Sequence, residues 1–250
     1  SVIVYKTSQN AHRITGAVRE RFLFVIVVMP AAVAAGASAG TAARRAVAAA
    51  AAAVVHLTGD DEAEHLIDLR QQIGFVPQKG VLFSGTIASN LRFGNAEATD
   101  AQVVQAAQIA QAEEFIEEKP EKYESPISQG GTNVSGGQKQ RLAIARAIAK
   151  HPRIFVFDDS FSALDLKTDA KLRKALSDTV QESTVIIVAQ RISTILHADQ
   201  ILVLDEGEIV GKGTHEELMK HCTVYQEIAK SQMSAKELGL TDGEEGEYHE

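Results

Sequence analysis

The sequence predicts an α/β fold in which helices cover a parallel β-sheet. The strand signal is a set of short, continuous runs of β-branched and aromatic residues, as in strands buried on both faces. Segments of helical composition lie between these runs, and the order strand, helix, strand favours parallel pairing. The expected strands are 154–157, 185–188, 201–204 and 208–210, and the expected helices include 138–150 and 167–176, with 96–119 almost wholly helical. The turn signal Asp205-Glu206-Gly207 separates the last two strands.

Composition and charge narrow the class of protein. The chain has 250 residues, of which 45% are hydrophobic and 23% charged, enough for one large domain or a domain with an embedded subdomain. The formal net charge of -8 excludes a nucleic-acid-binding protein that relies on a basic surface. A single cysteine, Cys222, excludes an internal disulfide framework and fits a reducing cytoplasm. The first residue is Ser1 rather than methionine, which fits a fragment of a longer protein.

The composition changes twice along the chain. Residues 1–65 are rich in alanine and contain an uncharged stretch at 22–43, so this atypical segment is left unassigned. Residues 66–238 alternate apolar runs, helical periods and turns, and form the expected α/β domain, with a helical subdomain at about 80–150. Residues 239–250 form an acidic tail that we expect to be disordered.

A glycine-rich turn stands directly before one of the predicted helices. Ser135 is a natural N-cap, and Gly136 and Gly137 leave the backbone N–H groups at the helix start uncovered. Unpaired N–H groups and the helix dipole both attract anions. The turn is therefore a candidate phosphate-binding site.

Two carboxylates end the strand predicted at 154–157. Asp158 and Asp159 follow that strand directly. The carboxyl ends of parallel strands are where α/β folds bind ligands, and oxygen ligands suit Mg²⁺. Asp158 is therefore a candidate magnesium ligand.

The order of these motifs resembles that of one family. Residues 134–141, Val-Ser-Gly-Gly-Gln-Lys-Gln-Arg, resemble the LSGGQ signature of ABC ATPases, and 153–160 resemble the Walker B strand that follows it. Residues 162–165 resemble the D-loop, 188–194 the switch strand and 73–78 the Q-loop, in the family's order and spacing. The text after the Q-loop, KGVLFSGTIASNLRFG, is typical of exporter cassettes. Most of the expected α/β domain thus resembles the ATP-binding cassette of a multidrug-exporter-type ABC transporter.

The resemblance implies a fold and a set of roles. It implies a P-loop NTPase-like (RecA-like) parallel-sheet core with an inserted helical subdomain, and it implies ATP and Mg²⁺ as ligands. Asp158 and Gln78 would hold Mg²⁺, while Asp159, Gln190 and Gln78 would stand at catalytic positions. The residues that would face an ATP bound by a second cassette are Ser135, Gly136, Gly137, Gln138 and Asp165.

Three departures from the family pattern concern hydrolysis. The position after the Walker B aspartate normally carries glutamate, the base that orients the attacking water, but this chain has Asp159. The switch normally carries histidine, but this chain has Gln190. No GxxxxGK[ST] motif occurs, and residues 36–45 offer glycines and a threonine but no lysine, whose point charge Arg44 does not replace. The aromatic residue that stacks on adenine is not identifiable either, with Tyr5 only a remote candidate.

Three explanations compete for residues 1–65. The uncharged stretch at 22–43 passes the length test for a transmembrane helix, but its small residues contribute little hydrophobicity and Pro30 interrupts it. A signal peptide is disfavoured because a nucleotide-binding domain without disulfides follows. We prefer a corrupted or misread segment in place of the true strand, P-loop and helix. A βαβ unit needs about thirty residues, and no second copy has room before Gln78. A frame error in a GC-rich gene would give text of this alanine- and arginine-rich kind, and an unshifted reading frame on resequencing would remove that hypothesis.

The resemblance also implies a division of labour between two chains. In ABC proteins two cassettes sandwich two ATP molecules, and each ATP contacts the signature of the opposite cassette. The changes at Asp159 and Gln190 would therefore impair the ATP on this chain's own face, whereas the intact signature would complete a partner's site. This pattern resembles the degenerate half of heterodimeric ABC exporters. We expect an ABC-type ATPase, weak or inactive alone, at the cytoplasmic face of the plasma membrane, with its transmembrane domain outside this chain.

Two other functions stay open. A non-transport ABC ATPase of the DNA-repair or translation type is disfavoured by the exporter-like text after the Q-loop. A catalytically dead ABC remnant with a regulatory role is favoured by the absent lysine. Measurable Mg-ATP affinity of the isolated chain would argue against the remnant. The resemblance implies that the membrane helices would select the exported substrate.

Overall fold

The computed structural model describes residues 23–27, 70–179, 183–205 and 208–233. Within these ranges six strands form one sheet, and two further strands form a small second sheet. The expectations for the P-loop region at 36–45, for Tyr5 and for the acidic tail lie outside the described residues.

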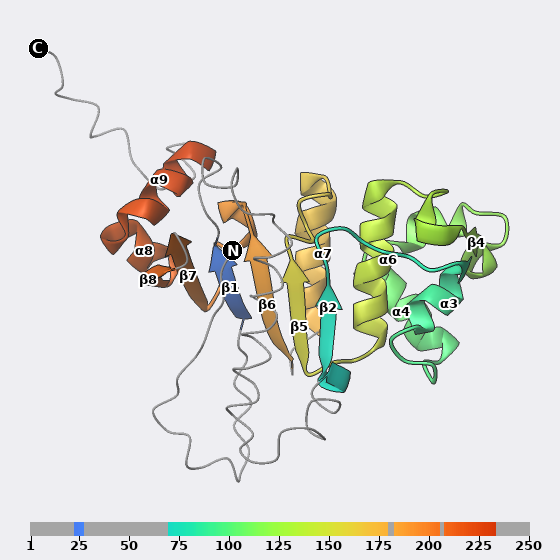
Figure 1. Ribbon diagram of the computed structural model, residues 1–250. Helices are drawn as coiled ribbons and strands as arrows, with labels where there is room; N and C mark the ends of the chain where they lie inside the picture. The colour runs from blue at the N-terminus through green and yellow to red at the C-terminus, as the bar shows by residue number, and fades with distance from the viewer. Residues whose placement is uncertain (1–22, 28–69, 180–182, 206–207, 234–250) are drawn as a thin grey trace, which may run out of the picture.

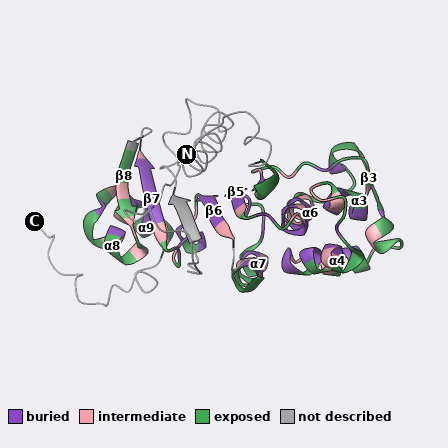
Figure 2. Cartoon of the chain, turned by 90° about the horizontal axis from the view of Figure 1, so that it is seen from below, coloured by how far each residue is buried: buried purple, intermediate pink, exposed green. Residues whose placement is uncertain are grey.

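The main sheet is parallel except at one edge. Along the sheet the strands follow the order β2 (Ile73–Val76), β5 (Ile154–Asp158), β6 (Thr184–Ala189), β1 (Leu23–Val27), β7 (Gln200–Asp205) and β8 (Glu208–Gly213). All neighbours pair in parallel apart from β7 and β8, which are antiparallel. The predicted α/β class and its four expected strands are confirmed, and β8 is longer than expected. Figure 2 shows β6 and β7 largely buried, as continuous apolar runs require.

Strand β1 lies inside the sheet, although its residues belong to the alanine-rich N-terminal segment. Leu23 is in register with Val185 of β6, and Phe24 is in register with Gln200 of β7. A transmembrane helix is therefore wrong for residues 23–27, and the rest of that uncharged stretch lies outside the described residues. No helix in the described part of the chain has the length and apolarity to cross a bilayer. A short strand from the N-terminal segment thus joins β6 to β7.

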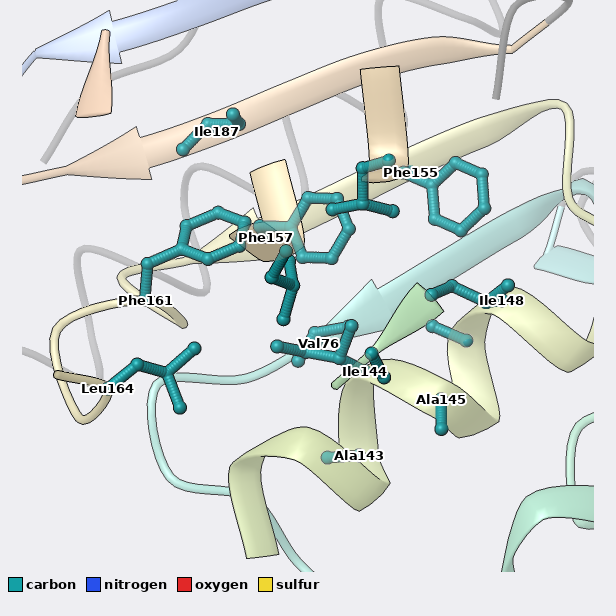
Figure 3. Close-up of a cluster of buried hydrophobic side chains, with 14 of the residues drawn as sticks. Val76, Ala143, Ile144, Ala145, Ile148, Phe155, Phe157, Phe161, Leu164 and Ile187 are labelled. Atoms are coloured by element: carbon teal, nitrogen blue, oxygen red, sulfur yellow. The ribbon is translucent and has the colours of Figure 1, made fainter. Parts of the chain in front are cut away.

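Helix α6 (Gly136–Ala149) packs on the sheet beside β2 and β5. Figure 3 shows Ile144 of this helix near Val76 of β2, with Phe155 and Phe157 of β5 in the same cluster. All four side chains are buried. Burial of one such side chain contributes about 1.5–3 kcal/mol to the stability of the fold, so this cluster holds α6 firmly against β2 and β5.

An inserted helical part stands at the β2 end of the sheet (Figure 1). It contains α3 (Ile87–Arg92), α4 (Asp100–Ile109), α5 (Glu113–Glu117), the short helices η1 (Lys122–Glu124) and η2 (Gln129–Gly131), and the antiparallel pair of β3 (Gly85–Thr86) and β4 (Pro126–Ile127). The expected helical stretch at 96–119 is thus two helices, with Gln111 between them at φ +56°. Helices α3 and α4 both pack on α6.

One arginine fastens α3 to α6. Arg146 donates through Nε to the carbonyl oxygen of Asn90 at 2.9 Å and through Nη2 to Asn90 Oδ1 at 2.8 Å. Its Nη1 donates to the carbonyl oxygen of Val81 at 2.8 Å. The guanidinium also lies over the rings of Phe83 and Phe93. Burial lowers the pKa of Arg146 to about 10, so it is still charged at neutral pH and makes three charge-assisted hydrogen bonds.

Three further α-helices follow β5 in the portion of the chain that the structure describes. Helix α7 (Leu166–Thr179) follows β5, whereas α8 (His215–His221) and α9 (Thr223–Gln232) stand at the β8 end of the sheet (Figure 1). The sequence analysis predicted α7 but neither α8 nor α9. Tyr225 of α9 is fully buried, and its hydroxyl lies 2.7 Å from Nδ1 of His215. This contact ties the start of α8 to α9.

Acidification should destabilise this end of the molecule through His215. Burial lowers the pKa of His215 from 6.5, so the folded protein binds this proton less tightly than the unfolded chain. Its stabilising contribution is therefore complete above pH 6.5 and is lost as the pH falls through 6.5 toward the folded pKa. His215→Gln should flatten the fall in the free energy of unfolding below pH 6.5, measured by denaturant titration at several pH values.

The matched control for this prediction is His221→Gln. His221 is an exposed histidine at the other end of the same helix, so its replacement should leave the fall in stability unchanged. Equal pH dependence in the two variants would contradict the role assigned to His215.

Candidate functional site

The three predicted catalytic side chains meet at the carboxyl end of the parallel strands. Asp159 directly follows β5, Gln78 lies two residues after β2, and Gln190 directly follows β6. The amide nitrogen Nε2 of Gln78 donates to Asp159 Oδ2 at 3.0 Å, and that of Gln190 donates to the same oxygen at 2.8 Å. The structure therefore brings together residues that are 81 and 31 positions apart in the chain.

The turn after β5 is fixed to both neighbouring strands. The N–H of Asp159 donates to the carbonyl oxygen of Val188 at 2.8 Å, and the hydroxyl of Ser160 donates to that of Val76 at 2.8 Å. Asp159 itself has a φ of +46°, in the left-handed region that aspartate tolerates better than most residues. These bonds set the direction in which its carboxylate points.

The two adjacent carboxyl groups are electrostatically strained. Burial raises the pKa of Asp158, and the neighbouring Asp159 raises it further. Burial also raises the pKa of Asp159, while the hydrogen bond from Gln78 and the charge of Arg191 oppose that rise. Buried acidic groups of this kind favour a bound cation, because it offsets both desolvation and mutual repulsion.

The glycine-rich helix start is exposed, as the phosphate-site prediction requires. Ser135 is the N-cap of α6: its hydroxyl accepts from the N–H of Gln138 at 3.2 Å, and Gln138 Oε1 accepts from the N–H of Ser135 at 3.0 Å. This capping box engages the N–H groups of Ser135 and Gln138, which leaves those of Gly136 and Gly137 for an external anion. A Cβ atom added at Gly136 would meet nothing within 4 Å.

The N-terminus of α6 lies on the same side of the molecule as the carboxyl ends of β2 and β5 (Figure 1). A Cβ atom added at Gly137 would lie 3.6 Å from the carbonyl oxygen of Ala163, so the D-loop segment runs beside the glycine turn. Asp165, predicted to face a partner's nucleotide, is exposed and accepts from the N–H of Thr168 at 2.9 Å. This bond lowers the pKa of Asp165 and caps the first turn of α7.

A residue without an assigned role in the sequence analysis links the Q-loop to the signature helix. Gln140 is 1% exposed; its Nε2 donates to the carbonyl oxygen of Pro77 at 3.0 Å, and its Oε1 accepts from the N–H of Gly80 at 2.8 Å. A Cβ atom at Gly80 would lie 2.9 Å from the carbonyl oxygen of Lys139, so the loop passes very close to the helix. The sequence signal that could have identified Gln140 is its position on the apolar face of a predicted helix, where a buried polar side chain needs a hydrogen-bond partner.

The described donors fit Mg²⁺. No group of three or more His, Cys, Asp or Glu side chains in the described ranges is arranged to hold a metal. Mg²⁺ is usually held by one or two carboxylates together with substrate phosphates and water. The buried carboxylate of Asp158 and the amide oxygen of Gln78, whose nitrogen is turned to Asp159, are a donor set of that kind.

The fold and this site define the class: a P-loop NTPase-like α/β domain with an inserted helical part. A family model described as ABC transporter matches residues 38–162, starting inside the alanine-rich segment. A solved structure of a bacterial Atm1-family ABC exporter with ATP bound is similar, with a TM-score of 0.72 and 32% identity. The similarity covers 86% of this chain and 38% of that chain. The chain belongs to the ABC transporter family.

Curated relatives carry consistent names. An uncharacterized ABC transporter ATP-binding protein of Mycobacterium tuberculosis is 46% identical over 178 residues, which are 70% of this chain and 30% of the relative. A provisionally named multidrug export ATP-binding/permease protein of Staphylococcus aureus is 44% identical over 160 residues, 64% of this chain and 28% of the relative. The chain thus spans less than a third of the length of these relatives.

Proposed function

We propose that this chain is an ATP-binding cassette of an ABC exporter, with an impaired hydrolysis site on its own face and a signature that completes a partner's site. The observation that carries the proposal is the contrast between two parts of the structure. The carboxylate of Asp159 is engaged by the amides of Gln78 and Gln190, whereas the signature turn presents uncommitted N–H groups to solvent.

The chemistry of the two glutamines and the aspartate supports slow hydrolysis of an ATP bound on this chain's own face. An aspartate side chain is one methylene shorter than glutamate, so Asp159 reaches less far toward a water that it would have to orient. General-base catalysis contributes about 10²- to 10⁴-fold to a rate, and a displaced base loses most of that factor. Gln190 donates a hydrogen bond, but unlike a histidine it cannot take up a proton and become positively charged.

The residues that would hold the cofactors are divided between the two faces. Asp158 and Gln78 would hold Mg²⁺ on this chain's own face, where bound Mg²⁺ neutralises phosphate charge. Ser135, Gly136 and Gly137 would donate to the phosphates of an ATP held by the second cassette, and Asp165 would lie at the boundary between the cassettes. Backbone N–H groups at a helix start suit this task because the helix dipole adds to their attraction for phosphate.

A transmembrane domain would be the third component. The chain covers only 38% of the similar exporter structure, and three apolar side chains near the Q-loop are exposed: Val81, Phe83 and Phe93, the last at 65%. Phe83 and Phe93 stack with their ring centroids 4.3 Å apart. Such apolar patches mark interaction sites, which supports a place at the cytoplasmic face of the plasma membrane under a membrane domain.

Reconstitution with the second cassette and the membrane domain of the same exporter tests the proposal. The assembly should hydrolyse ATP at least about tenfold faster than the full chain alone, because only the assembly brings this signature to a competent site. ATPase activity is measured at saturating Mg-ATP.

The opposite outcomes separate the alternatives. No increase on assembly would contradict the signature role. If the full chain also failed to bind Mg-ATP in an equilibrium titration, the catalytically dead remnant would be the better description. Strong hydrolysis by the chain alone would instead contradict the impaired own site.

A further inference from the structure

Gln232, the last residue of α9, is hydrogen-bonded to the backbone of the switch segment, residues 188–194. Gln232 donates through Nε2 to the carbonyl oxygen of Gln190 at 2.8 Å, and its Oε1 accepts from the N–H of Ile192 at 2.9 Å. The two bonds come from one amide group and bracket Arg191. They span 42 and 40 positions of sequence, so no local turn explains them.

The bonds act where the chain has left the sheet. Strand β6 ends at Ala189, and the short helix η3 (Ile192–Thr194) begins after two residues, so ladder bonds no longer fix the backbone of Gln190. A second contact holds the other end of this segment: Arg173 of α7 donates to the carbonyl oxygen of Ser193 at 3.2 Å. That arginine is itself fixed by an ion pair with the buried Asp169.

The backbone position of Gln190 decides where its side chain ends. From its held backbone the side chain reaches Asp159 Oδ2 at 2.8 Å, the same oxygen to which Gln78 donates. A continuous path of hydrogen bonds therefore runs from Gln232 through the backbone and side chain of Gln190 to the carboxylate after β5.

We propose that Gln232 is a positioning residue of the nucleotide site, which places Gln190 against Asp159 and makes α9 part of the switch. The inference rests on the proposed function in one respect, namely that Gln190 faces a nucleotide. It assigns to α9 a role in setting the switch, in addition to its packing on the sheet.

The test compares two glutamines of the same helix in the full chain. Gln232→Leu removes both bonds to the switch. Gln226→Leu is the matched control, because the amide of Gln226 donates to the carbonyl oxygen of Met219, far from the switch in the sequence. Hydrogen exchange of the Ile192 amide and the NMR resonance of the Gln190 side-chain amide are measured in both variants.

In Gln232→Leu the Ile192 amide should exchange about fivefold faster or more, the factor expected for one lost hydrogen bond. The Gln190 side-chain resonance should shift, while exchange within β6 stays as in Gln226→Leu. Identical Ile192 exchange and an identical Gln190 resonance in the two variants would overturn the proposal.

A third variant guards against loss of folding. Gln232→Glu keeps an acceptor for the N–H of Ile192 but has no donor for the carbonyl oxygen of Gln190. It should retain slow exchange at Ile192 and still shift the Gln190 resonance. Fast exchange at Ile192 with an unshifted Gln190 resonance would contradict the assignment of the two bonds.

These readouts need neither nucleotide nor partner. A normal ATPase gain on reconstitution together with no change at Ile192 would remove this inference and leave the proposed function intact. The reverse combination would remove the proposed function and leave the contact between α9 and the switch.

Discussion

Replacing Ser135 with arginine should, under the proposed function, abolish the ATPase gain on assembly with a second cassette, a loss of about tenfold or more. The long side chain would stand over the N–H groups of Gly136 and Gly137, which the capping box leaves for a phosphate. The change also removes the hydroxyl that accepts from Gln138, which costs about 1 kcal/mol of helix stability. The measurement is ATPase activity of the reconstituted assembly at saturating Mg-ATP.

Thr99→Arg is the matched control for Ser135→Arg. Thr99 is also an N-cap with a capping box, at the start of α4, so the control loses a cap of the same kind away from the signature. It should keep the ATPase gain and show a similar small loss of stability. If Ser135→Arg and Thr99→Arg retained the same activity, the division of labour between the two cassettes would be wrong.

Arg146→Met should lower the free energy of unfolding by about 3 kcal/mol. Methionine keeps the apolar stem but removes the three donors that satisfy the two oxygens of Asn90 and the carbonyl oxygen of Val81. Asn90 is 2% exposed, so water cannot readily replace the lost partner at its side chain. The contacts of the guanidinium with the two phenylalanine rings are lost as well. Denaturant unfolding of the full chain measures the effect.

Arg153→Met provides the comparison for Arg146→Met. Arg153 is exposed, and its contact with Gln72 is a long hydrogen bond of 3.5 Å. Its replacement should change stability by less than about 0.5 kcal/mol. A loss of that small size for Arg146→Met too would show that the network around Asn90 contributes little.

Local patterns were sufficient to predict strands β5 to β8 and the signature helix. The runs that became β5, β6 and β7 are continuous and β-branched, and no helical period competes with them. Ser135 with Gln138 three residues later forms the capping box that starts α6. The resemblance to ABC cassettes then added what spacing alone does not give, namely that Gln78, Asp159 and Gln190 would meet.

The remaining features depend on contacts between distant segments. Strand β1 has the β-branched and aromatic sequence LFVIV, but it lies in a long apolar and alanine-rich stretch whose length favoured a helix. Its place between β6 and β7 is seen only in the structure. The partners of Gln232 lie 42 and 40 positions away, and those of Gln140 lie 63 and 60 positions away. From sequence alone, a glutamine in a helix is expected to lie on the surface. Its role appears only when the distant segment that packs against it is known.

The two bonds of Gln140 have a mechanical consequence. They join the loop that carries Gln78 to α6, the helix that begins at the signature. A shift of either element would therefore displace the other or break these bonds. In the proposed assembly the loop would sense one ATP molecule and the helix start the other. Loss of a phosphate at one nucleotide would then be transmitted to its neighbour through a single buried amide, so a site that hydrolyses poorly could still report its occupancy.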